Sequence, residues 1–177
     1  TNPTFKINTA YHEAAHALVC HLHPFGRMVD HISIVDREQV SGLTVVHRDD
    51  YATVYFGELM GRMAYTLASY IAEKLYGKFL WRSFTCSHDL KSANELATKM
   101  VCIWGFGKRT GSRIMQDVKG DFLTTSKEVE LDIRDILQEA EKQAEEIITQ
   151  NDKKFRALGR ALLNGDGTLD TADILKI

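Results

Sequence analysis

The chain has 177 residues, of which 44% are hydrophobic and 26% charged, and its formal net charge at pH 7 is −2. This composition is ordinary for a folded globular protein and excludes an intrinsically disordered one. Because the chain has no basic excess, we expect no nucleic-acid partner. The length predicts one domain over residues 1–177, with room for a substantial core.

The three cysteines form no CxxC pair and are odd in number, which argues against a disulfide framework or a zinc finger. They favour a reducing compartment. No apolar run approaches the ~18 residues of a membrane-spanning helix, so we expect no spanning segment here. The chain begins at Thr1 without a methionine, which fits either a processed protein or a piece of a longer one.

The first predicted helix covers about residues 9–22. Asn8 or Thr9 can cap its start, and the following HPFG segment, with Pro24, ends it. The next segment, about residues 31–47, contains the β-branched runs HISIV and GLTVV on either side of a polar stretch. These runs predict a β-hairpin, the one hairpin in the chain.

The rest of the chain is predicted to be mostly helical. Apolar residues recur at intervals of three and four over about residues 53–76, which predicts a long amphipathic helix. A further helix is predicted over about 87–104, a helical pair over about 126–163, and a turn with a short helix in the tail. The predicted fold class is therefore mainly α, with one small β-hairpin.

The stretch AYHEAAHALV carries the most specific chemistry in the sequence. In a helix, His12 and His16 lie one turn apart on one face, so both imidazoles can reach one metal ion. Glu13 lies about 100° further around the helix, where it can flank the ion without binding it. Two nitrogen ligands and a flanking carboxylate are the arrangement used for metal-assisted hydrolysis.

The residues alone leave the third metal ligand open. In thermolysin-like enzymes the third ligand is a glutamate roughly twenty residues after the motif. Glu38 has that spacing, but it falls in the predicted hairpin turn. Glu73, Asp89 and Glu95 are carboxylates on predicted helices. An aspartate such as Asp89, in the first turn of a helix, is also commonly explained by the helix dipole.

The other histidines are predicted to have lesser roles. Four of them are expected to lie on the surface or in strands and not to bind the metal: His21, His23, His31 and His47. His88 can flank the site, and a role in orienting a ligand or substrate is the less favoured interpretation of this residue.

AYHEAAHALV resembles the signature of the FtsH-type AAA+ zinc metalloprotease family. SHDLKSANELATKMVCIWGF is similar to the segment in which that family's Asn-Asp-Leu run supplies an aspartate as third ligand. The resemblance covers about residues 7–177 and includes the stretches SGLTVV, AEKLYG and RALLNGDGTLDTADI. It implies a zincin-like protease fold with His12, His16 and Asp89 as zinc ligands, and it leaves Glu73 as the alternative to Asp89.

The resemblance further implies a zinc-dependent endopeptidase in which Glu13 is the general base. The strand GLTVV is expected to hold an extended peptide by main-chain hydrogen bonds, a mode that suits unfolded or loosely folded polypeptides. The family implies coupling to an ATPase and a homo-oligomeric ring, commonly a hexamer. It also implies a location in the cytoplasm or on the stromal or matrix side of an organelle, and it allows a membrane tether through segments outside this chain.

The sequence departs from the family pattern at several positions, and two of these departures, the changed helix around Leu67 and the missing ATPase, leave an alternative function open. Leu67, Ala68 and Ser69 stand where the family typically has Gly-Gly-Arg, Ala72 replaces a glutamate, and Ala15 replaces a glycine inside the motif. No GxxxxGK[ST] phosphate loop occurs in these 177 residues, so the ATPase module is absent from this sequence. The alternative is a catalytically inactive FtsH-like module for helical oligomerisation or adaptor binding.

Overall fold

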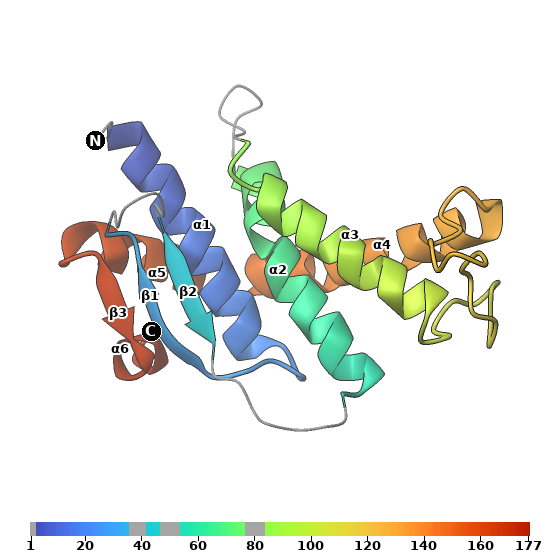
Figure 1. Cartoon of the computed structure of the whole chain (residues 1–177). Coiled ribbons are helices and arrows are strands. Elements are labelled where there is room, and N and C mark those ends of the chain that lie inside the picture. The colour runs from blue at the N-terminus through green and yellow to red at the C-terminus, as the bar shows by residue number, and fades with distance from the viewer. Residues whose placement is uncertain (1–2, 36–41, 47–53, 77–83) are drawn as a thin grey trace.

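A computed structural model of the chain describes residues 3–35, 42–46, 54–76 and 84–177. Helices make up most of it, and three short strands form one antiparallel sheet (Figure 1). The mainly α fold class is confirmed. In chain order the elements are α1 (Pro3–Leu22), β1 (Val29–Ser33), β2 (Leu43–Val46), α2 (Phe56–Tyr76), α3 (Ser87–Cys102), α4 (Lys127–Gln150), α5 (Asp152–Asn164), β3 (Thr168–Asp170) and α6 (Thr171–Leu175).

Helix α1 begins at Pro3, six residues before the start that the sequence predicted at residue 9. Proline is tolerated in the first turn of a helix, where its missing N–H would have no intrahelical partner. Thr9 does not cap the helix, because its hydroxyl donates back to the carbonyl of Phe5 at 3.0 Å, as a threonine inside a helix does. The predicted start at Asn8 or Thr9 was therefore wrong.

Two further helix ends differ from the predicted ones. Helix α2 begins at Phe56, and the backbone N–H of Tyr55 donates to the Glu58 carboxylate at 2.7 Å, which satisfies one of the donors at the helix start. Helix α3 ends at Cys102, two residues early. Gly105 turns the chain there with a φ of 70°, a backbone conformation that favours glycine.

The sheet has the strand order β2-β1-β3, with both pairs antiparallel. The sequence predicted only the β1–β2 hairpin, so β3 is an addition to the prediction. Strand β3 has three residues and pairs with a strand far away in the sequence, so it leaves no local pattern. Ser33 and Thr168 pair their hydroxyls at 3.2 Å across this junction. Among the described strands, β2 lies at one edge of the sheet.

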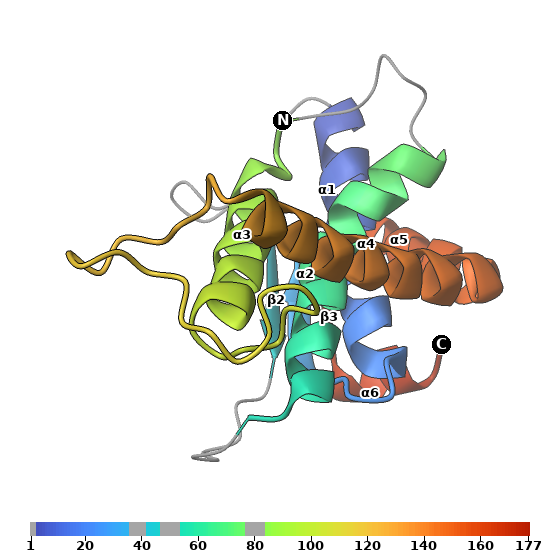
Figure 2. The same cartoon turned by 90° about the vertical axis from the view of Figure 1, so that its right-hand side faces the viewer.

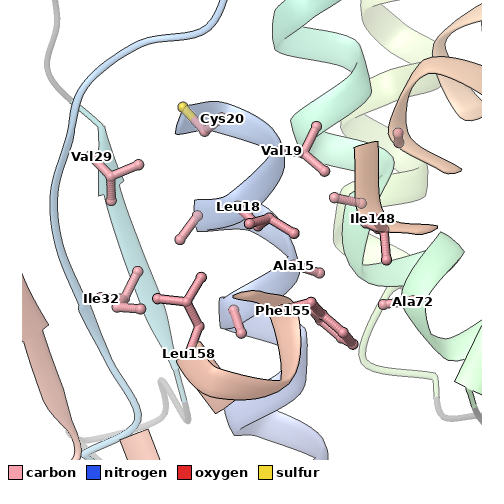
Figure 3. Packing of buried hydrophobic residues seen from close by; sticks show 14 of the residues in the cluster. Ala15, Leu18, Val19, Cys20, Val29, Ile32, Ala72, Ile148, Phe155 and Leu158 are labelled. Carbon is pink, nitrogen blue, oxygen red and sulfur yellow. The ribbon is translucent and has the colours of Figure 1, made fainter. Parts of the chain in front are cut away.

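One hydrophobic cluster surrounds α1. The alanines of α1 are fully buried, and their small side chains let the sheet, α2 and α5 approach closely. Figure 3 shows Ile32 of β1 on one side of α1, Ile148 of α4 on the other, and Phe155 and Leu158 of α5 against it. The four alanines are Ala10, Ala14, Ala15 and Ala17.

A second hydrophobic cluster joins α2, α3 and α4. Figure 2 shows α4 crossing α2, and the two helices are in contact. Met63 and Leu67 of α2 and Met100 of α3 are buried in this cluster. Because α2 belongs to both clusters, it fixes the position of α3 relative to α1. This arrangement holds the start of α3 beside the middle of α1.

Among the residues that the structure describes, no helix is both long and apolar enough to cross a membrane.

Candidate metal centre

The two histidines of the HEAAH motif meet on one face of α1. Their Nε2 atoms lie 3.2 Å apart, and the two rings are almost perpendicular at 76°. His16 is buried and His12 is half-buried. The helical spacing of four residues therefore gives the geometry that the sequence predicted, with both rings directed toward the start of α3.

Asp89, in the first turn of α3, completes the group. Its Oδ2 atom lies 3.4 Å from His12 Nε2 and 3.4 Å from His16 Nε2. The donor atoms of these three residues all lie within 4.8 Å of one another. The fully buried Ser69 of α2 donates its hydroxyl hydrogen to the same Oδ2 atom at 2.9 Å. Three helices thus contribute to one cluster.

The hydrogen bonds of His16 determine which of its ring nitrogens carries the proton. Its Nδ1 lies 2.6 Å from the backbone carbonyl oxygen of Tyr65. A carbonyl oxygen can only accept, so in the neutral ring Nδ1 carries the proton and Nε2 offers its lone pair to the cluster. This outer hydrogen bond is characteristic of histidines that bind metals.

The mutual contacts of His16 and Asp89 shift both of their pKa values toward the charged forms. Burial lowers the pKa of His16, but the hydrogen bond with Asp89 and the charges of Glu13 and Asp89 outweigh it and raise the pKa above its usual value. Burial likewise raises the pKa of Asp89, but hydrogen bonds with His12 and His16 outweigh it and hold the pKa well below its usual range. The negative charges of Glu13 and Asp89 therefore favour a positive charge at this position, which either a protonated His16 or a bound cation can supply.

The spacing of the three donors fits a small tetrahedral cation. Zinc binds nitrogen and oxygen ligands at about 2.0 to 2.2 Å, which places neighbouring ligand atoms roughly 3.4 Å apart. The separations between the donor atoms of His12, His16 and Asp89 are 3.2, 3.4 and 3.4 Å. Two imidazoles and one carboxylate are also a ligand set that zinc favours, and three protein ligands leave a fourth position for water or substrate.

Glu13 lies beside this cluster and is held by the sheet. Its side chain is buried, and its Oε2 accepts a hydrogen bond of 2.6 Å from the Thr44 hydroxyl of β2. Gly42 leaves room for it, because a Cβ at that position would lie 2.5 Å from Glu13 Oε1. A cavity of about 380 Å³ opens in front of these residues. It is lined by His12, Glu13, His16, Gly42, Leu43, Thr44, Val46, Tyr65, Thr66, Thr85, His88 and Asp89.

The other predicted carboxylates lie elsewhere. Glu95 is exposed on α3 and pairs with Lys91 at 4.0 Å. Glu73 is half-buried on α2 and lies near His12 and Cys86, outside the cluster with Asp89. Glu38 lies outside the described residues.

Of the remaining histidines, His88 lines the cavity beside Asp89. His21 is exposed and His31 lies in β1. His23 was predicted to lie on the surface or in a strand, and that prediction was wrong. It is buried after α1, where its Nε2 meets Gln143 Oε1 at 2.9 Å and its Nδ1 accepts from the Phe25 N–H at 3.0 Å. His47 lies outside the described residues.

The sequence did not indicate two residues that support the cluster, or a third that lies near it. Ser69 and Thr44 orient Asp89 and Glu13 respectively, and the sulfur of Cys86 lies 4.0 Å from His12 Nδ1. A single serine or threonine produces no hydrophobic periodicity, so the sequence gives no sign that its hydroxyl group will contact a distant residue. The substitution of the family's usual arginine by Ser69 was the one visible indication that this position differs.

A family model described as peptidase family M41 matches residues 2–177. Curated relatives named ATP-dependent zinc metalloprotease FtsH also match. The proteins from Nitrosococcus oceani and Photobacterium profundum are each 28% identical, over 95% and 96% of this chain. The one from Syntrophotalea carbinolica is 41% identical over 58% of this chain. This chain covers 28%, 26% and 16% of those three relatives. The expected FtsH-type resemblance is confirmed, and the chain belongs to peptidase family M41.

Proposed function

We propose that this chain is a zinc-dependent endopeptidase domain. The observation that carries the proposal is the tight grouping of one donor atom each from His12, His16 and Asp89 at separations of 3.2 to 3.4 Å. Family membership supports it, as do the names of the relatives, which describe those proteins as zinc metalloproteases.

In this proposal His12, His16 and Asp89 hold the zinc ion. When bound, the ion would supply Lewis-acid polarisation of a water molecule and of the scissile carbonyl group. The Nδ1 hydrogen bond of His16 keeps its Nε2 available as a ligand, and the Ser69 hydroxyl fixes the rotamer of Asp89. These outer contacts hold the ligand side chains in place, so the side chains need to reorganise little when zinc binds.

Glu13 acts as the general base. It accepts a proton from the attacking water and later delivers that proton to the departing amine. Thr44 donates to Glu13 Oε2, so the other carboxylate oxygen, Oε1, remains for the proton. Burial in the cavity wall excludes bulk water from the carboxylate and limits its motion.

Strand β2 is the proposed substrate-binding edge. Leu43, Thr44 and Val46 line the cavity, and β2 pairs with β1 on one side only among the described strands. An extended polypeptide can add to such an edge through main-chain hydrogen bonds, with little dependence on its side chains. This mode supports unfolded or loosely folded polypeptides as substrates.

The wider assembly is part of the same proposal. The relatives are named ATP-dependent, and this chain covers about a quarter or less of their length, so we propose that an ATPase module in a longer chain delivers substrates. We further propose a homo-oligomeric ring such as a hexamer. The proposed location is the cytoplasm or the stromal or matrix side of an organelle, with a membrane tether outside these residues.

The first test combines zinc stoichiometry with cleavage of an unstructured polypeptide. We expect a zinc ion bound by His12, His16 and Asp89 in the purified protein, and we expect Glu13→Gln to retain zinc while cleavage is abolished. Asp89→Ala should lose that zinc without unfolding. Glu95→Gln, which alters an exposed carboxylate on the same helix as Asp89, is the matched control and should change neither property.

Folded protein that binds no zinc at this site after reconstitution would refute the peptidase proposal. That result would favour the non-catalytic helical module. Leu67, Ala68 and Ser69, the departures on which that alternative depends, are buried in the structure, so they alter core packing rather than an exposed surface.

A further inference from the structure

A second group of metal-binding side chains lies on the other side of the His12 ring. Cys86 directly precedes α3 and is 2% exposed, and its sulfur lies 4.0 Å from His12 Nδ1. Glu73 of α2 is half-buried nearby. One donor atom from each of His12, Glu73 and Cys86 lies within 4.8 Å of the other two.

The two groups use opposite edges of one imidazole. His12 Nε2 faces His16 and Asp89, whereas His12 Nδ1 faces the thiol. Nitrogen and sulfur ligands of one tetrahedral zinc ion are roughly 3.5 Å apart, given Zn–N of about 2.0 Å and Zn–S of about 2.3 Å. The 4.0 Å separation is close to that value and too long for a strong hydrogen bond. The other donor separations in this group are no longer than 4.8 Å.

Solvent reaches this side of His12 through a separate cavity. It has a volume of about 410 Å³, and His12, Ser69 and Glu73 line it together with Tyr11 and Tyr76. The cavity in front of Glu13 and Asp89 has a different lining apart from His12. A hydrated cation can therefore reach Glu73 without passing through the proposed substrate cavity.

We propose that His12 Nδ1, Glu73 and Cys86 form a second site, for a thiophilic divalent cation such as Zn²⁺, Co²⁺ or Cd²⁺. Sulfur and imidazole ligands select these ions over Mg²⁺ and Ca²⁺, which prefer oxygen ligands. Binding releases the thiol proton of Cys86 to solvent. This site depends on its own residues and does not rest on the proposed peptidase activity.

Sharing His12 couples the two sites. A neutral imidazole has one nitrogen lone pair, so it can bind ions at both nitrogens only after losing its ring proton. An ion bound by Cys86 and Glu73 therefore competes with the first site for His12 or perturbs the position of the ring. We expect that excess zinc inhibits peptide cleavage, and that Cys86→Ser reduces the inhibition.

The direct test uses Co²⁺ added to the metal-free protein. A thiolate bound to Co²⁺ gives a charge-transfer absorption in the near ultraviolet that imidazole and carboxylate ligands do not give. We expect this absorption in the wild-type protein and its loss in Cys86→Ser. Cys102→Ser is the matched control, because Cys102 is also buried but lies at the end of α3 away from the cluster, and it should keep the absorption.

Two further variants separate this proposal from the proposed function. Asp89→Ala removes a ligand of the first site only, so it should keep the thiolate absorption. Glu73→Gln should weaken Co²⁺ binding at the thiolate site by at least about 10-fold, since losing a direct ligand should cost no less than losing an outer-shell partner. If Cys86→Ser does not fold, Glu73→Gln provides the same comparison without altering the thiol. No thiolate absorption in folded wild-type protein at saturating Co²⁺, or absorption that survives Cys86→Ser, would overturn the proposal.

Discussion

A hydrogen bond of 2.9 Å joins the Ser69 hydroxyl of α2 to Asp89 Oδ2 of α3. The same oxygen atom lies 3.4 Å from the Nε2 atoms of both histidines on α1. Asp89 is therefore positioned by a buried side chain from a third helix, in addition to its place at the start of α3. The hydroxyl at position 69 determines which carboxylate oxygen faces the histidines.

We predict that Ser69→Ala lowers zinc affinity about 10- to 100-fold, because removal of an outer hydrogen bond frees the rotamer of the ligand. A competitive zinc chelator measures the change in affinity. Ser112→Ala, an exposed serine distant from the cluster, is the control and should bind zinc as the wild type does. Unchanged affinity in Ser69→Ala would mean that helix packing alone positions Asp89.

Thr44 provides a second test, which concerns Glu13 as the proposed general base. Thr44→Val keeps the shape of the side chain but removes the 2.6 Å hydrogen bond to Glu13 Oε2. We predict that kcat falls about 10-fold while zinc content stays the same, because a less constrained base spends less time in the productive position. Steady-state kinetics on an unstructured polypeptide measure kcat. Thr44→Ser retains the hydroxyl and should recover most of the activity, and equal losses in both variants would contradict the role assigned to the hydroxyl.

Gly42→Ala is expected to displace the Glu13 side chain by a steric clash. The added Cβ would lie 2.5 Å from Glu13 Oε1 and 2.8 Å from Thr9 Cγ2. Because Glu13 is buried and held by Thr44, its displacement should lower the melting temperature, and cleavage should fall at least about 10-fold. Thermal unfolding and cleavage rates are measured on the same preparation. A Gly42→Ala variant with full activity would show that the position of Glu13 tolerates displacement.

The positions of the candidate ligands on their helices followed from the sequence, because helical spacing is local information. The four-residue spacing of His12 and His16 becomes a shared face in any α-helix, and Asp89 falls in the first turn of a helix with a clear apolar period. The choice of Asp89 over Glu73 required the family resemblance, because spacing along the chain does not determine which helices meet. In the structure, α2 packs in both hydrophobic clusters, and this packing determines which part of α3 meets α1.

Features that depend on distant parts of the chain were not predictable. Strand β3 pairs its Thr168 with Ser33 of β1, and three residues carry too little alternation to indicate a strand. The burial of His23 could not be predicted, because its hydrogen-bond partner, Gln143, lies on α4, 120 residues later in the chain. The hydrogen bonds from Ser69 to Asp89 and from Thr44 to Glu13 likewise join separate elements.

Asp132 of α4 holds the loop that follows α3. Its carboxylate is 1% exposed and accepts the backbone N–H groups of Arg109 and Thr110 at 2.9 and 2.8 Å, the Thr110 hydroxyl at 3.0 Å and the Arg109 guanidinium at 2.9 Å. Burial raises the pKa of Asp132, but the hydrogen bonds from Thr110 and Arg109 outweigh it and hold the pKa below its usual range. The ionised carboxylate is therefore the form that stabilises the fold.

We predict that Asp132→Asn lowers the free energy of unfolding at pH 7 by about 2 to 4 kcal/mol, since it weakens charge-assisted hydrogen bonds and leaves a donor pair facing other donors. The folded-state pKa lies below the unfolded value of about 3.9, so this contribution is complete above pH ~4 and is lost as the pH falls through the folded-state pKa. The difference between wild type and variant should therefore be the same at pH 7 and pH 5 and smaller at pH 3 in urea unfolding curves. Asp135→Asn removes the exposed partner of Arg109, at 2.7 Å, and should cost no more than about 1 kcal/mol. A difference for Asp132→Asn that stays constant down to pH 3 would show that the charge of Asp132 does not contribute to stability.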